Sequence, residues 1–214
     1  MKAARHDRTL SPNPSPVKGE GSGQSRSASF TLTVPGTKQP VSVLVVIHDP
    51  QLNILLLERA AHPGYWQSVT GSREGSESLI ATAAREVAEE TGIVIGPPRS
   101  QPRLAAPHPQ RGQAVDASLG RPGGGIVIRP DDLTDWHFSS RFEIFVEWRD
   151  RYAAGVTHNV EHLYSLCVPP DTPVRWHADE HRAQRWLPWR TAAAACFSWT
   201  NRDAIRMLGL AAQR

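Results

Sequence analysis

The segment from Gly71 to Ile93 constrains the fold of this chain most, because it predicts a helix together with the place where that helix ends. Over residues 77–91, one helical face would carry Ile80, Ala84, Val87 and Thr91. Glycine at position 92 suits the left-handed conformation in which many helices end. A helix with one apolar face must pack against another layer of structure, so the segment indicates a layered domain.

The same predicted helix carries three glutamates on one side. At about 100° per residue, Glu86, Glu89 and Glu90 project from one sector of about 100°. Like charges at this spacing destabilise an isolated helix. The glutamates are therefore either solvated, as acidic helix faces commonly are, or neutralised by a cation. Carboxylate oxygens suit a hard divalent ion such as Mg²⁺, which often bridges carboxylates and a phosphate.

Several strands are expected around this helix. The apolar, β-branched run 41–47 suits a strand that is buried on both faces, and residues 54–57 follow a turn as its hairpin partner. Further strands are predicted over residues 142–148, 162–168 and 183–187. Residues 191–210 predict a C-terminal helix that breaks near Thr200. Strands mixed with helices indicate an α/β or α+β domain.

Two segments differ from the rest in composition. Residues 1–37, without a periodic apolar pattern, predict a disordered tail ahead of a domain over 38–214, and the Pro/Gly-rich residues 97–130 predict a loose insertion. Each of the segments 1–40 and 97–130 has a net charge of +4, whereas the whole chain has +3, so the remainder has −5. The basic residues thus lie in the loose segments, and no nucleic-acid groove is expected.

The composition also bears on location. An apolar run of the ~20 residues that a membrane span requires is missing, and the N-terminus has no apolar core of a secretory signal. The two cysteines, Cys167 and Cys196, are expected to be reduced thiols of a cytoplasmic protein. The composition of the tail also raises the alternative of a translation start further along, at Val34.

Other kinds of reactive site find little support. The nine histidines lack the spacing of a zinc site. Ser68 and Ser198 have no neighbouring His/Asp arrangement that would activate a nucleophile. The glycines at 123–125 lack the Lys-Ser/Thr pair of a phosphate-binding loop.

The glutamate helix and the loop before it resemble the signature of the Nudix hydrolases. Every fixed position of that signature is occupied, by Gly71, Glu77, Arg85, Glu86, Val87, Glu89, Glu90, Gly92 and Ile93. The resemblance implies an α/β fold, a Nudix-type α/β/α sandwich with a mixed sheet between helices. It implies Mg²⁺ as the cofactor, with Glu86 and Glu90 as ligands and Glu77 paired with Arg85. Which glutamate deprotonates the attacking water stays open, with Glu89 as the candidate.

The flanking residues 66–72, 142–145, 151–157 and 198–202 resemble the branch of that family that acts on dihydroneopterin triphosphate. This implies magnesium-dependent hydrolysis of 7,8-dihydroneopterin 3′-triphosphate to the monophosphate and pyrophosphate, in folate biosynthesis. It also implies Glu180 as a third metal ligand and substrate contacts at Lys38, Arg59, Thr70, Phe142, Glu143, Ile144, Phe145 and Ser198.

Two alternatives stay open beside this interpretation. One is a pyrophosphatase that acts on nucleoside triphosphates, and the other is a non-catalytic Nudix module that binds a nucleotide or a partner protein. If the protein is a hydrolase of either kind, its partner is a small-molecule pterin or nucleoside triphosphate. No nucleic acid and no membrane are expected to take part.

Overall fold

The structure, a computed structural model, describes residues 36–96, 127–129 and 132–213. The predicted disordered tail up to residue 35, and the predicted insertion apart from residues 127–129, lie outside these ranges. Within the described ranges, no helix is long and apolar enough to cross a membrane.

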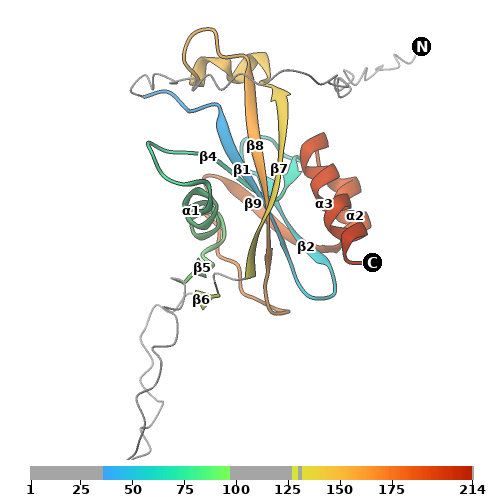
Figure 1. Cartoon of the computed structure of the whole chain (residues 1–214). Coiled ribbons are helices and arrows are strands. Elements are labelled where there is room, and N and C mark those ends of the chain that lie inside the picture. The colour runs from blue at the N-terminus through green and yellow to red at the C-terminus, as the bar shows by residue number, and fades with distance from the viewer. Residues whose placement is uncertain (1–35, 97–126, 130–131, 214) are drawn as a thin grey trace, which may run out of the picture. The chain divides into compact units, whose positions relative to one another are not determined.

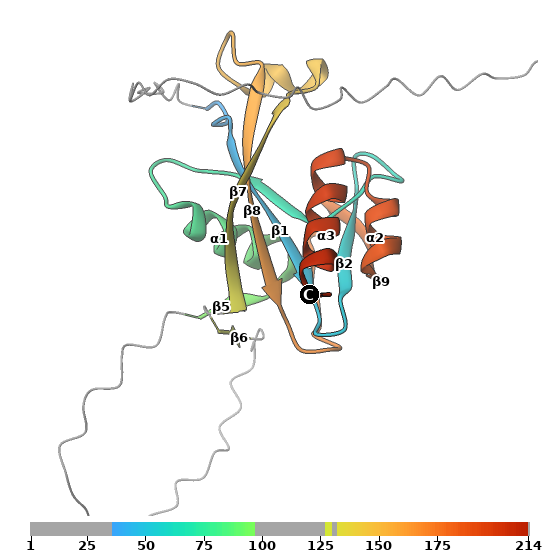
Figure 2. The same ribbon diagram turned by 45° about the vertical axis from the view of Figure 1, so that its right-hand side comes forward.

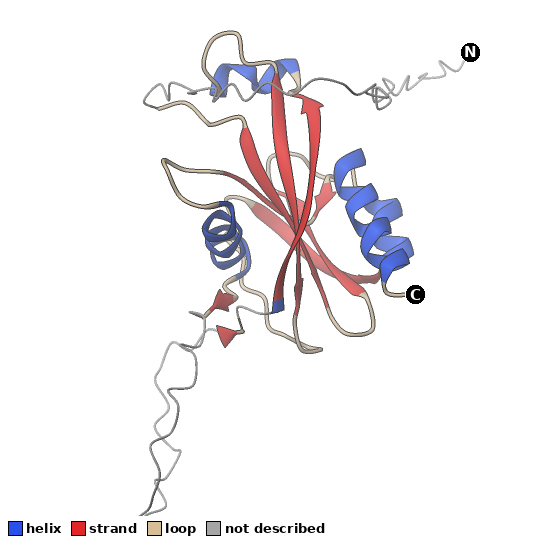
Figure 3. Cartoon of the chain, in the orientation of Figure 1, coloured by secondary structure: helices blue, strands red, loops and turns tan. Residues whose placement is uncertain are grey.

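A mixed sheet of seven strands forms the centre of the domain (Figures 1 and 3). Its main path runs β3-β2-β1-β8-β7, while β4 pairs with β1 and β9 pairs with β2. The β1 and β8 strands are parallel, and the other pairs in this sheet are antiparallel. The strands are β1 (Val41–His48), β2 (Asn53–Arg59), β3 (Trp66–Gln67), β4 (Val69–Ser72), β7 (Leu133–Glu143), β8 (His158–Cys167) and β9 (His181–Pro188).

Helices cover both faces of this sheet (Figures 1–3). On one face lies α1 (Leu79–Thr91), and on the other lie α2 (Trp189–Ala195) and α3 (Trp199–Ala211). Alternate residues of β1 enter different cores: Val43 packs in the cluster with Val87, whereas Leu44 packs in the cluster with Ile205. The prediction of a central strand buried on both faces is therefore confirmed.

The neighbours of β1 explain how the sheet presents α1. Along its whole length β1 pairs with β8, but on its other edge it pairs with β4 through Ser42–Val45 and with β2 only at His48. The predicted pairing of β1 with β2 is thus confirmed next to the turn that joins them. On its other edge β2 pairs with β9 from Asn53 to Arg59. This divergence brings β4, and the loop that leads into α1, beside the start of β1.

The helix ends as predicted and begins two residues later than predicted. Gly92 has φ 70 in the left-handed region, and its N–H donates to the Ala88 carbonyl. At the other end, the Ser78 side chain accepts from the Ala81 N–H, so the helix starts at Leu79. The predicted apolar face is wrong at Ile80, which is 52% exposed, because the helix turns the neighbouring Leu79 toward the core beside Ala83 and Val87 instead.

One strand prediction is wrong in part, and most of one strand was not predicted. The strand expected over 142–148 ends at Glu143, and Val146–Arg151 forms a 3-10 helix that the Tyr152 N–H closes on Arg149. Most of β7 was not expected, because its largely exposed residues give no alternating apolar pattern. Its register also shifts between Asp135 and Ser139.

Residues 127–129 of the predicted insertion are part of the described domain. The two-residue strand β6 (Val127–Ile128) pairs in parallel with β5 (Val94–Ile95), and Ile128 is buried in the core below α1. The boundary of the insertion at residue 130 is therefore wrong at this end. The C-terminal helix breaks at residues 196–198, shortly before the expected position.

Candidate active site

A cleft of about 570 Å³ lies beside the loop between β4 and α1. Six of the predicted metal ligands and substrate contacts line it: Lys38, Arg59, Thr70, Glu86, Glu90 and Glu180. They come from the segment before β1, from β2, β4 and α1, and from the segment before β9. The cleft therefore gathers groups that are up to 142 positions apart in the chain, from Lys38 to Glu180.

Close packing of β4 against α1 places Glu86 at this cleft. A Cβ atom added to Gly71 would lie 1.7 Å from Cδ of Glu86, so the carboxylate occupies the space that a side chain at position 71 would need. One helical turn further on, Glu90 accepts a hydrogen bond from the Thr70 N–H at 3.3 Å. The two glutamates thus line the cleft on the side of β4.

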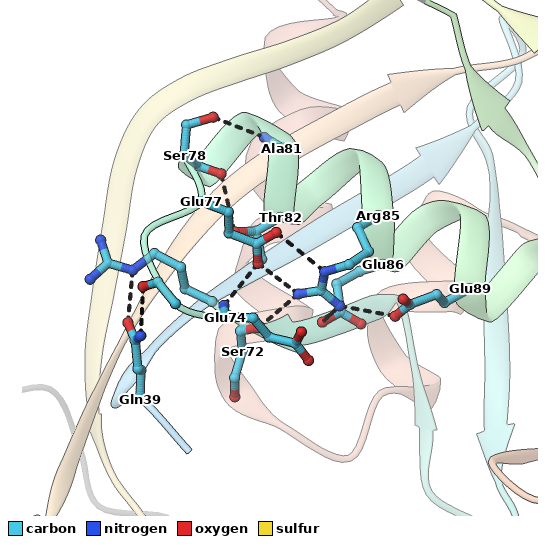
Figure 4. A network of polar contacts seen from close by, with 12 residues as sticks. Gln39, Ser72, Glu74, Glu77, Ser78, Ala81, Thr82, Arg85, Glu86 and Glu89 are labelled. Atoms are coloured by element: carbon cyan, nitrogen blue, oxygen red, sulfur yellow. Dashed lines mark hydrogen bonds and ion pairs between the residues drawn. The ribbon is translucent and has the colours of Figure 1, made fainter. Parts of the chain in front are cut away.

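Arg85 holds the loop and the helix together (Figure 4). Its guanidinium lies 2.8 Å from Glu77, 2.9 Å from Glu86 and 2.9 Å from Glu89, and it donates to the Ser72 carbonyl at 3.0 Å. Its hydrogen bond is the main reason that the pKa of Glu77 falls to about 2. The expected Glu77–Arg85 pair is present in the structure, and it fixes the loop onto the helix.

Glu86 and Glu90 are acids in an unfavourable environment. Burial raises the pKa of Glu86 to about 7; Arg85 opposes this shift, and the charges of Glu90 and Glu89 add to it. Burial also raises the pKa of Glu90, against the effect of the hydrogen bond with His181 at 3.0 Å. A buried and a partly buried carboxylate that repel each other at the wall of a cleft fit a divalent cation, and oxygen donors suit Mg²⁺.

The other two glutamates lie differently. The side chain of Glu89 is 55% exposed, pairs with Arg85 and does not line the cleft. Glu180 lines the cleft and is exposed. No three His, Cys, Asp or Glu side chains in the described part of the chain are grouped closely enough to hold a metal ion as they stand. The trio Glu86, Glu90 and Glu180 therefore shares the cleft without converging.

Two of the cations that line the cleft, Arg59 and Lys38, were predicted from the sequence. Arg59 donates to Gln67 at 3.3 Å, its Nε is buried without a partner, and burial is the main cause that lowers its pKa. It forms no pair with Glu58, which binds Arg182 at 3.6 Å instead. Lys38 is placed by its backbone N–H, which donates to the Arg151 carbonyl. Both cations can face an anionic ligand in the cleft.

Sequence reasoning missed several residues that line the cleft, among them Gln39, Gln67, Arg73 and His181. Gln39 accepts from Arg73 at 2.9 Å and donates to the Gly75 carbonyl at 2.7 Å, which ties the loop after β4 to the segment before β1 (Figure 4). No short motif marks these residues. Only His181 could have been found from the sequence, because it directly follows the predicted metal ligand Glu180.

Five predicted substrate contacts do not line the cleft. Ile144 is buried, Glu143 pairs with Arg149, and Ser198 caps α3 by accepting from the Asn201 N–H. The others, Phe142 and Phe145, lie at and just after the end of β7. Phe145 packs edge-on against Trp148 at 5.0 Å, and Trp148 lies 5.7 Å from the Arg59 guanidinium. Phe145 is thus linked to the cleft indirectly: it contacts Trp148, which lies near Arg59, and Arg59 lines the cleft.

Comparisons with known proteins identify the family. Residues 38–118 match the NUDIX domain model. The dihydroneopterin triphosphate diphosphatase of Escherichia coli K12 is 36% identical over 169 residues, which cover 78% of this chain and 91% of that protein. This chain belongs to the Nudix hydrolase family. A second relative of the same name, from Haemophilus influenzae, is 32% identical over 171 residues, 79% of this chain and 87% of its own.

Solved structures agree with the assignment of this Nudix hydrolase. The E. coli dihydroneopterin triphosphate pyrophosphohydrolase matches with a TM-score of 0.59 and 35% identity, over 80% of this chain and 95% of its own. The MutT protein from Methanosarcina mazei Go1 matches with a TM-score of 0.51 and 18% identity, over 81% and 95%, and shows the fold alone. The predicted α/β fold with a mixed sheet between helices is confirmed.

Proposed function

We propose that this Nudix hydrolase releases pyrophosphate from 7,8-dihydroneopterin 3′-triphosphate, as a step of folate biosynthesis, and leaves dihydroneopterin monophosphate. The observation that carries the proposal is the cleft, where two carboxylates of α1, one buried and one partly buried, lie with Arg59, Lys38 and Thr70. This combination suits a triphosphate accompanied by a divalent cation. The substrate named for the E. coli and H. influenzae relatives makes it specific.

The cofactor of the proposed reaction is Mg²⁺, held by Glu86 and Glu90 with Glu180 as a third ligand. The raised pKa values of Glu86 and Glu90 support this choice, because a bound cation would favour their ionised forms. When bound, such an ion supplies charge neutralisation at the phosphates and lowers the pKa of a water. Glu180 would complete the set from the segment before β9.

The side chains around the carboxylates bind and orient the triphosphate. Arg59 offers a planar fork and Lys38 a point charge to phosphate oxygens, and the Thr70 hydroxyl is a further donor. Gln67 holds Arg59 at 3.3 Å, so the guanidinium is positioned before the substrate arrives. In the reaction, oxygen of water forms a bond to phosphorus, the P–O bond to the leaving group breaks, and the proton of the water passes to a base.

Glu89 is the proposed base, and its ion pair with Arg85 must open before it can act. Its carboxylate is paired with Arg85 at 2.9 Å, and must separate from that guanidinium before it can accept a proton in the cleft. Glu89→Gln is expected to lower kcat and to leave the substrate KM nearly unchanged, because the side chain does not line the cleft. An unchanged kcat would assign the proton to another group.

Product analysis tests the proposed reaction. Purified protein with dihydroneopterin triphosphate and Mg²⁺ should release pyrophosphate and dihydroneopterin monophosphate, and chelation of the metal should stop the release. Release of orthophosphate instead, or saturable binding without turnover, would contradict the proposal. A nucleoside triphosphate pyrophosphatase would use the same cleft, so competition between the pterin and purine triphosphates at equal concentration separates these two activities. The cytoplasmic location stays a prediction.

A further inference from the structure

A second cavity, of about 300 Å³, lies on the face of the sheet that α3 covers. Figure 2 shows α3 on that face and α1 on the other. It is bounded by β1, β7, β8 and α3, and its volume is at the lower end of the range for small-molecule pockets. Apolar and aromatic side chains make up much of the wall. The lining includes Leu44, Phe138, Leu163, Trp199 and Met207, with Glu161 among them.

Glu161 is a buried ionisable group in a largely apolar cavity wall. It lies in the middle of β8, is 8% exposed, and has no salt bridge among the described residues. Burial raises its pKa to about 7, and a hydrogen bond from the Thr200 hydroxyl acts in the opposite direction. A carboxylate offers about four acceptor sites, so Thr200 leaves most of them unused.

A buried acceptor without a hydrogen-bond partner lies two positions before Glu161. Asn159 precedes Glu161 by two positions on β8, so the two side chains project from the same face of the strand. Its Nδ2 donates to Ser42 at 2.6 Å, while its Oδ1 is buried and has no hydrogen-bond partner. Buried acceptors without donors are rare in native proteins, and they match a ligand that brings donors.

Strand pairing sets the spacing between this cavity and the phosphate cleft. Ser42 on β1 is paired in register with Ser72 on β4 and with Glu161 on β8, so the three residues stand side by side across the strands. At ~4.8 Å per strand, Ser72 and Glu161 are about 10 Å apart, and Ser72 lines the cleft. Tyr152 is near both residues, because a hydrogen bond with Ser72 lowers its pKa and the charge of Glu161 raises it.

We propose that Glu161 recognises the ring of the substrate, with its carboxylate accepting hydrogen bonds from the N3–H and the 2-amino group of a 2-amino-4-oxopyrimidine edge. The Oδ1 atom of Asn159 is a further acceptor for the amino group, and Trp199 and Phe138 supply apolar contact to the ring. This assignment rests on the proposed function, because the phosphates must lie in the Glu86 cleft for the ring to reach Glu161. The separation of about 10 Å between the backbones of Ser72 and Glu161 is of the order of the combined length of the fused ring and the three-carbon chain that joins it to the phosphates.

The edge that Glu161 would read is shared by pterin and guanine and is absent from adenine. The carboxylate therefore selects among triphosphates that the cleft alone would accept equally. Replacing it with an amide removes one of the two acceptors and presents a donor to the donors of the ring. A lost hydrogen bond to a charged group corresponds to about a tenfold or larger loss of affinity.

Glu161→Gln tests the assignment against Glu147→Gln, which alters an exposed glutamate of the 3-10 helix. We expect KM for dihydroneopterin triphosphate and for GTP to rise about tenfold or more in Glu161→Gln, with KM for ATP unchanged. Binding of neopterin, followed by its fluorescence, should weaken by the same factor. Equal changes for all three triphosphates, or neopterin binding equal to that of the Glu147→Gln control, would overturn the assignment.

Neopterin carries no phosphates, so its binding separates the failure of this assignment from the failure of the proposed function. Absence of turnover in the wild-type protein would contradict the proposed function alone. If Glu161→Gln does not fold, Met207→Trp provides the test from the opposite wall, because Met207 lines the cavity from α3 and is only partly buried. It should obstruct the cavity and raise KM for the pterin and for GTP, while an unaltered KM for both would contradict the proposal.

Discussion

Replacing Glu161 by glutamine should stabilise the protein at alkaline pH. The folded-state pKa of this carboxyl is about 7, against an ordinary value of 4.5. The folded protein thus binds the proton more tightly than the unfolded chain does. The resulting contribution to stability is fully present below pH 4.5 and is lost as the pH rises through 7. Converted at about 1.4 kcal/mol per pH unit, the difference amounts to about 3 kcal/mol when both states are ionised.

Between pH 5 and pH 8 the linkage gives a change of about 2.5 kcal/mol, because at pH 5 the unfolded chain has already lost much of its proton. Urea unfolding of wild-type protein, Glu161→Gln and the exposed control Glu147→Gln, at both pH values and without metal, measures it. The free energy of unfolding of Glu161→Gln, relative to wild type, should rise by about 2.5 kcal/mol from pH 5 to pH 8. Glu86 and Glu90 titrate in all three proteins, so their contributions cancel when the unfolding free energy of a variant is compared with that of wild type.

An equal difference between Glu161→Gln and wild type at the two pH values would refute this reasoning, because it would mean that the carboxyl titrates normally in the folded state. The predicted gain in stability has the opposite sign to the predicted loss of pterin affinity. A residue that is retained for binding shows this combination, since residues of binding sites often lower the stability of the fold while they serve its function.

Three further substitutions test the phosphate cleft and the packing behind it. Glu90→Gln should keep the fold and lower magnesium-dependent turnover by orders of magnitude, and near-normal turnover would remove this residue from the metal site. Gly71→Ala should displace the Glu86 carboxylate, whose Cδ lies 1.7 Å from the new Cβ, and lower kcat/KM about 100-fold with little change in Tm. Gly209→Ala places a Cβ 2.3 Å from the Trp189 ring and should cost about 1–3 kcal/mol of stability in urea unfolding, with kcat/KM unchanged at temperatures where the protein is folded.

Local patterns predicted those parts of the molecule that local interactions determine. The spacing from Gly71 to Ile93 predicted α1 and its glutamates, because periodicity and the glycine at the C-terminus are properties of neighbouring residues. The central strand β1 was predictable because both of its faces are buried, which leaves an uninterrupted apolar run. In contrast, β7 has mostly exposed residues, and its sequence carries no such pattern.

The sites depend on contacts between distant segments, which one sequence does not display. Taken by itself, Glu180 is an acid in a polar loop, and only the resemblance to a known family pointed to it. Gln67 and His181 line the cleft because β2 pairs with β3 and β9. Glu161 reads as an ordinary polar residue of a strand until α3 is seen to cover it.

The central claim is the hydrolysis of a pterin triphosphate in the Glu86 cleft. Its most direct test is the rate of pyrophosphate release from dihydroneopterin triphosphate, with and without Mg²⁺, beside a panel of nucleoside triphosphates. We predict metal-dependent release with the highest kcat/KM for the pterin. Activity on nucleoside triphosphates alone would contradict the claim and assign the cleft to nucleotide hydrolysis.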